Sequence, residues 1–276
     1  MKKNNFTVKY KQEGKRLSDI ISSELSVSKK QVQVWLDNKL VLVNAKRIWM
    51  RKHVVKEGDQ IEILQNTKLI SKNKQISIIW EDDYYLIVNK QPGIITNAAK
   101  NSLEERLRYK KNNPNICAVH RLDKETSGCL IFASSLDAKE RAIPLFKEKQ
   151  ITKVYRALTI GRFPSSWREI RTDIEGYIAI TRVKLLDANH KASYLELQIE
   201  TGRTHQIRKH LAFKRFPVLG DKKYAGTLNE LSVRQPRQML HAYRLSFSHP
   251  YTKKNIKVTA QVPSDFKNLL QNLKLS

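Results

Sequence analysis

The chain has 276 residues, enough for one large domain or two of ordinary size with a real hydrophobic core. Its 52 Lys and Arg against 26 Asp and Glu give a formal net charge of +26, which favours a polyanionic partner, most commonly nucleic acid. No apolar run approaches the roughly 18 residues of a membrane-spanning helix and the first residues lack an apolar signal core, so we expect a soluble, cytoplasmic protein without membrane contacts.

The first 65 residues predict a small basic module. Residues 1–13 are polar and indicate a loose tail or an edge strand. In residues 14–65, apolar side chains at helical spacing predict two helices, and short strands are expected at 39–43 and 61–64. This arrangement resembles the S-four-type RNA-binding domain, named after a ribosomal small-subunit protein, although Asn44-Ala45 replaces the usual Asn-Gly turn. A small unrelated basic domain is the alternative.

A second domain is expected over residues 76–276, after a polar linker at 66–75. Apolar runs and period-two alternation predict strands, and helical spacing with capping residues predicts helices. The expected strands are 76–80, 86–89, 116–119, 130–133, 153–160 and 195–199, and the expected helices are 102–110, 137–150, 204–211 and 264–273. Pro144 predicts a kink or a late start in the second of these helices, and Thr204 is the expected cap of the third.

The central stretch of the chain places Asp123 in a short polar loop between the two buried runs 116–119 and 130–133. Polar residues on a loop held by buried strands are common positions for functional sites. A solvated turn, with Asp123 paired to Arg121 or Lys124, is the alternative that the residues alone leave open.

Two further stretches carry candidate site residues. Tyr155 lies on one face of the strand 153–160, where a core role is the alternative to a functional one. The run Thr201-Gly-Arg-Thr-His-Gln-Ile-Arg208 predicts a turn followed by a helix that brings His205 and Arg208 close together at i,i+3 spacing. Taken alone, this helix favours a basic RNA-contacting or capping role.

Together these motifs resemble the signature of the RluA-type pseudouridine synthases, which modify RNA. The matching stretches are His120-Arg-Leu-Asp-Lys-Glu-Thr-Ser-Gly128, Lys153-x-Tyr-x-Ala157 and Gly202-Arg-Thr-His-Gln-Ile-Arg208. The resemblance implies an α+β fold, with a mixed, largely antiparallel sheet and flanking helices in the catalytic domain, plus a small α/β domain at the N-terminus. Gly220-Asp221, Tyr224 and His249-Pro250 complete the pattern as scaffold, whereas Gln91 before the proline departs from it.

The resemblance also implies roles for individual residues. Asp123 would be the catalytic carboxylate, and Arg208 would pair with it. Tyr155 would stack on the target base, and Arg121 would hold the rearranged RNA. The expected reaction is isomerisation of uridines, in ribosomal RNA or alternatively in transfer RNA, by a monomer that needs no cofactor. A flanking arginine favours the ionised carboxylate that this chemistry requires.

Two rival functions belong to other classes. A non-catalytic RNA-binding or ribosome-assembly protein would use Asp123 structurally, but simple binding does not require an aspartate and an arginine motif. A metal-dependent nuclease would combine Asp123 with His120, His205 or His210, but hard divalent cations prefer more oxygen ligands than lie near these histidines. Cys117 and His120 have the spacing of metal ligands, but a structural zinc site needs about four ligands and no second pair is present. Cys117 and Cys129 are therefore interpreted as small buried residues, and no metal site is predicted.

Overall fold

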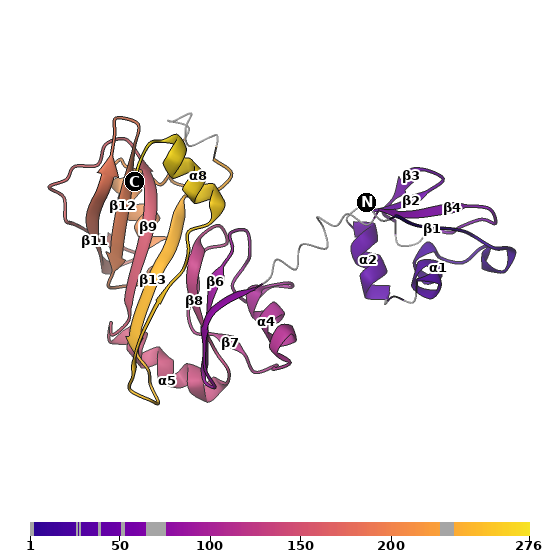
Figure 1. Cartoon of the computed structure of the whole chain (residues 1–276), viewed down its shortest axis with the longest axis horizontal. Helices are drawn as coiled ribbons and strands as arrows, with labels where there is room; N and C mark the ends of the chain where they lie inside the picture. The colour runs from indigo at the N-terminus through magenta and orange to yellow at the C-terminus, as the bar shows by residue number, and fades with distance from the viewer. Residues whose placement is uncertain are drawn as a thin grey trace. The chain divides into compact units, whose positions relative to one another are not determined.

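A computed structural model describes residues 3–25, 27, 29–37, 40–50, 53–64, 76–226 and 235–276. The chain divides into two compact units, Met1–Gln75 and Ile76–Ser276 (Figure 1). The predicted linker, residues 66–75, and Lys39 at the start of a predicted strand lie outside the described residues. Each unit is therefore considered by itself.

The smaller unit is a four-stranded sheet in the order β1-β4-β2-β3, with two helices. Its elements are β1 (Lys3–Thr7), a short 3-10 helix (Tyr10–Gln12), α1 (Leu17–Glu24), α2 (Lys29–Asp37), β2 (Val41–Val43), β3 (Lys46–Ile48) and β4 (Gln60–Leu64). Because β1 pairs antiparallel with β4, residues 3–7 form an edge strand of this sheet, one of the two alternatives raised for the N-terminal residues. The predicted turn Asn44-Ala45 joins β2 to β3, with positive φ angles of 50° and 62°.

The core of the smaller unit is aliphatic. The residues whose helical spacing predicted two helices, including Leu17, Ile21, Val32 and Leu36, all pack into it, together with Val41 and Ile61 from the strands. Hydrophobic burial of one face of each helix accounts for these short helices, because isolated helices of this length are marginal in water.

The larger unit is built on a ten-stranded sheet. Its main path runs β10-β11-β12-β9-β13-β8-β6-β5, while β14 pairs with β13 and β7 with β8. The strands are β5 (Ser77–Glu81), β6 (Tyr85–Lys90), β7 (Cys117–Ala118), β8 (Ser127–Ala133), β9 (Thr152–Ile160), β10 (Glu169–Ile174), β11 (Tyr177–Ala188), β12 (Ala192–Ile199), β13 (Leu240–Ser248) and β14 (Asn255–Thr259). β8 and β13 pair in parallel and the other described pairs are antiparallel, which confirms the predicted mixed, largely antiparallel sheet of an α+β fold.

The described residues of this unit also form the helices α4 (Leu103–Lys111), α5 (Leu136–Lys147), α6 (Gln206–Phe213) and α8 (Ser264–Asn272). α5 begins at Leu136, where the Ser135 hydroxyl accepts a hydrogen bond from the Ala138 N–H, so a late start at Pro144 was wrong and the proline lies inside the helix. The predicted Thr204 cap was also wrong. α6 begins after His205, because Gln206 organises the turn instead, accepting hydrogen bonds from the Thr201 hydroxyl and the Arg203 N–H.

Strand alternation divides the apolar residues of the larger unit between two core clusters. Along β8, Leu130 and Phe132 enter one cluster, whereas Cys129 and Ile131 enter the other. Cys117 lies in that second cluster as well, and both cysteines are free and buried, as predicted. In Figure 1 the strands β11, β12, β9, β13, β8 and β6 stand side by side, with α8 and α5 at opposite ends.

Candidate active site

The loop that carries Asp123 connects β7 to β8 and is anchored by a neighbouring loop. The hydroxyl of Thr96 donates to the Leu122 carbonyl at 3.1 Å and accepts from the Leu122 N–H at 3.3 Å. The buried ammonium of Lys90 donates to the Lys124 carbonyl at 2.9 Å. Backbone groups on both sides of Asp123 are thus held by hydrogen bonds, which fixes the direction of its side chain.

The polar loop ends at Gly128, a position that only glycine can occupy. It pairs with Ala242 where β8 and β13 run in parallel, and its φ is +113°. A Cβ at this position would lie 2.2 Å from the Ala242 carbonyl oxygen, a distance that no side chain can tolerate. Beside it, the Ser127 hydroxyl and Nδ1 of His241 are 2.9 Å apart, a second link between these strands.

Three side chains converge on the Asp123 carboxylate. Nη1 of Arg208 lies 2.7 Å from Oδ2, Nε2 of Gln238 lies 3.4 Å from the same oxygen, and Nε2 of His205 lies 3.6 Å from Oδ1. The Asp123 side chain keeps 27% of its surface exposed, whereas that of Arg208 keeps 8%. The carboxylate is therefore charge-paired from behind and still open to a substrate.

Arg208 is itself held by Asp221. Its Nε and Nη2 donate to the two oxygens of Asp221 at 2.6 and 2.9 Å, which leaves Nη1 for Asp123. The planar fork of the guanidinium therefore grips Asp221, not Asp123, with two bonds. Gly220 places this aspartate, since its φ is +76° and a Cβ there would lie 1.9 Å from the Arg237 carbonyl oxygen.

His205 and Gln238 are further members of the site. The Tyr224 hydroxyl and Nδ1 of His205 are hydrogen-bonded at 3.0 Å. Burial lowers the pKa of His205, and the opposing attraction of Asp123 does not cancel this effect. Gln238 is oriented toward Asp123 by a hydrogen bond of 2.7 Å from its Nε2 to the Thr126 hydroxyl. Sequence reasoning placed Asp221 only in the scaffold and missed Gln238 altogether, whose only signal is a polar residue directly before an apolar strand.

The four site residues named from the sequence line one pocket. Arg121, Asp123, Tyr155 and Arg208 surround it, and its other walls come from Leu122, Thr126, Ile199, Gly202, Arg203, His205, Gln206, Ile207 and Leu240. Tyr155 on β9 is 8% exposed, and burial raises its pKa, so its ring is a neutral wall of the pocket. The arrangement offers one accessible carboxylate beside an aromatic ring, a suitable setting for a flat, uncharged ligand.

The three histidines considered as metal ligands with Asp123 do not meet. Nε2 of His120 lies 3.2 Å from the Ile131 N–H and accepts its hydrogen bond, and Nδ1 of His210 lies 2.9 Å from the Thr181 hydroxyl. Only His205 of the three approaches Asp123. Across the part of the chain that the structure describes, no three or more His, Cys, Asp or Glu residues are grouped to hold a metal ion.

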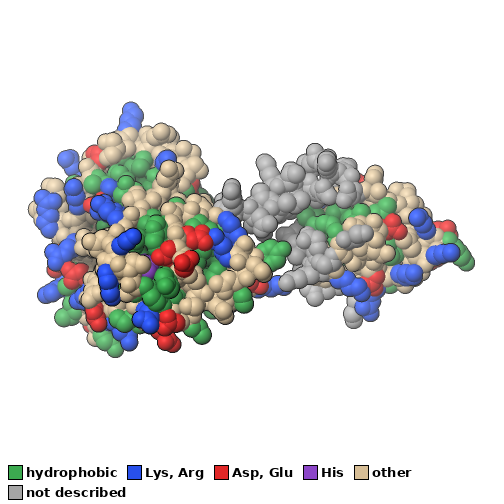
Figure 2. Space-filling model, turned by 60° about the horizontal axis from the view of Figure 1, so that its bottom comes forward, with side chains coloured by type: hydrophobic (Ala, Val, Ile, Leu, Met, Phe, Trp, Pro, Cys, Tyr) green, Lys and Arg blue, Asp and Glu red, His purple; other side chains and the backbone are tan. Residues whose placement is uncertain are grey.

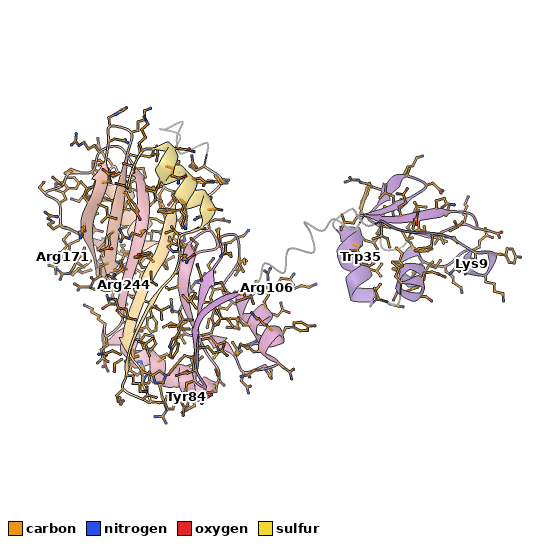
Figure 3. The ribbon with its side chains drawn as sticks, viewed as in Figure 1. Lys9, Trp35, Tyr84, Arg106, Arg171 and Arg244 are labelled. Carbon is orange, nitrogen blue, oxygen red and sulfur yellow. The ribbon has the colours of Figure 1, made fainter. Side chains whose placement is uncertain are left out.

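The surface of the larger unit carries many cationic side chains. In Figure 2 lysine and arginine side chains gather on the left side of the larger unit, the side that carries β11 and β12 in Figure 1. Arg171 on β10 and Arg244 on β13 mark two of the cationic positions (Figure 3). Such a surface suits a phosphate backbone. Among the described helices none is long and apolar enough to cross a membrane.

Comparison with known proteins gives consistent results. The family model described as RNA pseudouridylate synthase matches residues 84–213. Ribosomal large subunit pseudouridine synthase D of Neisseria meningitidis serogroup A is 31% identical, over 98% of this chain and 81% of the relative. The uncharacterized RNA pseudouridine synthase YhcT of Bacillus subtilis is 33% identical, over 94% of this chain and 93% of the relative.

A solved structure agrees with these relatives. The human RNA pseudouridylate synthase domain containing 1 superposes with a TM-score of 0.59 and 28% identity, covering 73% of this chain and 96% of that one. The similarity to the curated relatives extends over nearly the whole chain, and the matched segment 84–213 includes Asp123, Tyr155 and Arg208. The chain belongs to the RNA pseudouridine synthase family, in its RluA-type branch.

Proposed function

We propose that this synthase isomerises specific uridines of large-subunit ribosomal RNA, with Asp123 as the catalytic carboxylate. The observation that carries the proposal is the partly exposed Asp123 carboxylate, paired with Arg208 and facing a pocket walled by Tyr155. The choice of RNA is supported by the relative from Neisseria meningitidis, which is named for the large ribosomal subunit.

The reaction breaks the bond between ribose C1′ and uracil N1, turns the base, and joins C1′ to C5. The hydrogen on C5 leaves as a proton and N1 gains one, so atoms balance without oxidant, reductant or water. The step requires a carboxylate close to the glycosidic bond, as nucleophile or as proton acceptor. Asp123 supplies it, because its Oδ1 is not occupied by the Arg208 guanidinium.

The other pocket residues bind and orient. A uridine stacked within RNA has to leave its stack to reach Asp123, and the Tyr155 ring offers a face for the extruded base. The exposed Arg121 at the pocket rim is positioned to hold the RNA from which that base has left. Arg208 keeps the carboxylate in one orientation, with Asp221 behind it.

We assign the two units different tasks. Residues 76–276 form the catalytic domain, and residues 14–65 form an S-four-like RNA-binding domain that contributes affinity. The residues described in the smaller unit contain no counterpart of the Asp123–Arg208 pair, and Lys46 and Arg47 on β3 are exposed. Most of the affinity for RNA is expected from phosphate contacts of this kind.

The decisive experiment replaces the carboxylate of Asp123 by an amide of the same size. The assay follows release of a hydrogen label from C5 of uridine in ribosomal and transfer RNA, with and without a chelator. We expect Asp123→Asn to abolish release while RNA binding stays within about threefold, because phosphate contacts dominate affinity. Asp137→Asn, which alters an exposed carboxylate on α5 paired with Arg141, is the matched control and should retain release.

Each rival function makes a different prediction for this assay. A non-catalytic RNA-binding protein gives no release from any RNA, even with the parent protein. A metal-dependent nuclease cuts the RNA chain, and the chelator stops it. Sustained release by a folded Asp123→Asn protein would remove Asp123 from the catalytic role.

A further inference from the structure

The β10–β11 hairpin carries two exposed apolar side chains near its tip. Tyr177 is 57% exposed and Ile178 is 63% exposed, and they are consecutive residues at the start of β11. Single exposed apolar residues are ordinary on protein surfaces. Tyr177 differs from such residues because its ring contacts Arg203, a residue that lines the substrate pocket.

The hairpin tip is a tight turn. Ile174 pairs with Tyr177 across a two-residue loop, Glu175-Gly176, whose φ angles are +57° and +81°. Two positive φ angles define the type I′ turn that joins strands most tightly. The carboxylate of Asp173 also accepts a hydrogen bond of 2.9 Å from the Gly176 N–H. A tight turn and a side-chain hydrogen bond therefore support the backbone that carries Tyr177.

The same tip is fastened to the helix that carries Arg208. Glu175 forms an ion pair of 2.8 Å with Lys209 on α6, and Nε2 of Gln206 donates to the Ile180 carbonyl at 2.9 Å. Strand alternation puts Tyr177 on the same face as Thr181, the face to which Gln206 and His210 bind. Tyr177 thus lies on the face of β11 that α6 contacts, near the first turn of α6.

Arg203 connects Tyr177 to the pocket. Its guanidinium carbon lies 4.1 Å from the centre of the Tyr177 ring, a stacked cation–π contact. Arg203 is exposed and also lines the pocket that contains Asp123. The pocket wall therefore continues outward as a guanidinium stacked on one face of a phenol ring.

We propose that Tyr177 and Arg203 form a second base-stacking site, which takes an unpaired nucleotide next to the target uridine; this rests on the proposed function. Aromatic rings and arginine planes are the groups on which unpaired bases stack, and the cation also suits the adjoining phosphate. The nearby Arg121 is exposed on the same pocket, so cationic side chains flank the path of the strand. The site would select substrates whose flanking base is free to leave a duplex.

The first test measures binding of heptauridylate by fluorescence anisotropy in the full chain carrying Asp123→Asn, so that no RNA is converted. Stacking on an aromatic side chain is worth about 1–3 kcal/mol per base, and we expect Tyr177→Ala to weaken binding by about fivefold, the lower end of that range, because Tyr177 is only partly covered. Tyr177→Phe keeps the ring and should bind like the parent. Ile178→Ala is the matched control, equally exposed and adjacent but on the opposite face of the strand, and should change affinity by less than about twofold.

Salt separates stacking from charge. Binding of heptauridylate weakens with salt because phosphate contacts release counterions. The ratio of dissociation constants between Tyr177→Ala and its parent should stay constant from low to moderate salt, since the ring carries no charge. The corresponding ratio for Arg203→Ala should shrink as salt rises.

Several results would overturn the proposal. They are equal binding by Tyr177→Ala and its parent, an equally large decrease in affinity for Ile178→Ala, and no binding of heptauridylate at all. Circular dichroism melting of each variant confirms that the larger unit remains folded. The binding assay involves no turnover, so a Tyr177 effect without any label release by the wild-type chain would uphold this site and refute the isomerase assignment instead.

Discussion

The two units of the chain bury different kinds of side chain. In the described part of the smaller unit every buried side chain is apolar, and its ion pair Lys29–Asp19 is exposed, by 75% and 43%. The larger unit buries Arg208 and Asp221 at 8% and 0% exposure. Exposed pairs contribute little to stability, and buried charges are costly unless fully paired. Binding RNA through phosphates needs only surface charge, whereas holding one carboxylate in a fixed direction needs a buried network.

The largest difference between the two units is expected when one methyl group is introduced into each. Gly128→Ala forces a Cβ to within 2.2 Å of the Ala242 carbonyl oxygen at a φ of +113°, so β8 and β13 have to separate. We expect the free energy of unfolding of the larger unit to fall by more than about 4 kcal/mol. Urea unfolding followed by tryptophan fluorescence measures it, with Trp80 and Trp167 reporting on that unit.

Gly58→Ala is the matched change in the smaller unit. Gly58 has a similar φ of +83°, but nothing lies within 4 Å of an added Cβ. Only the strained backbone then costs stability, about 1–2 kcal/mol. Equal decreases in stability at the two glycines would show that backbone conformation, not the close approach of β13, accounts for Gly128.

Much of the larger unit's fold could be predicted from local patterns. Apolar runs located β6 and β8, because these strands are buried along nearly their whole length, and alternation located β9 and the end of β12. No helix or strand was predicted for residues 161–194, yet these residues form β10, β11 and the start of β12. Their turn, Glu175-Gly176, lacks the Asn-Gly or Asp-Gly pair that announces a tight hairpin.

The site was only partly predictable for a related reason. Asp123, Tyr155 and Arg208 stand in recognisable motifs, and the structure gathers them in one pocket. The hydrogen bond from Gln238 to Thr126 spans 112 positions, and no local pattern indicates such a contact. The bidentate grip of Asp221 on Arg208 likewise depends on where Gly220 turns the chain, which only the packed structure shows.

A smaller effect is expected when the buried network is altered without a steric clash. In Arg208→Lys a single ammonium replaces the fork that bonds Asp221 twice and Asp123 once. We expect turnover to fall by about a hundredfold, comparable to the loss of one oriented donor in other active sites, with a much smaller change in RNA affinity. Label release at saturating RNA, together with a binding titration, measures both quantities.

The control for this change is Arg182→Lys, which alters an exposed arginine paired with Glu200 at 2.8 Å on the same sheet. Its turnover should match the parent, because an exposed pair tolerates the exchange. If Arg208→Lys also turned over like the parent, Arg208 would have no role in holding Asp123 for the reaction. Burial of the Arg208 network would then make no difference to turnover.

The smallest expected effect comes from removing the smaller unit. A chain that begins at Ser71 keeps the larger unit, with its own core and the whole Asp123 network. We expect RNA affinity to fall by about tenfold at moderate salt, and the slope of log K against log salt to become shallower by about 0.7–0.9 for each phosphate that the shorter chain no longer neutralises. Turnover at saturating RNA should be unchanged, because the residues that line the Asp123 pocket all belong to the larger unit. A folded Ser71 chain that is inactive even at saturation would place part of the chemistry in the smaller unit, and an unchanged salt slope would deny that unit its role in binding phosphates.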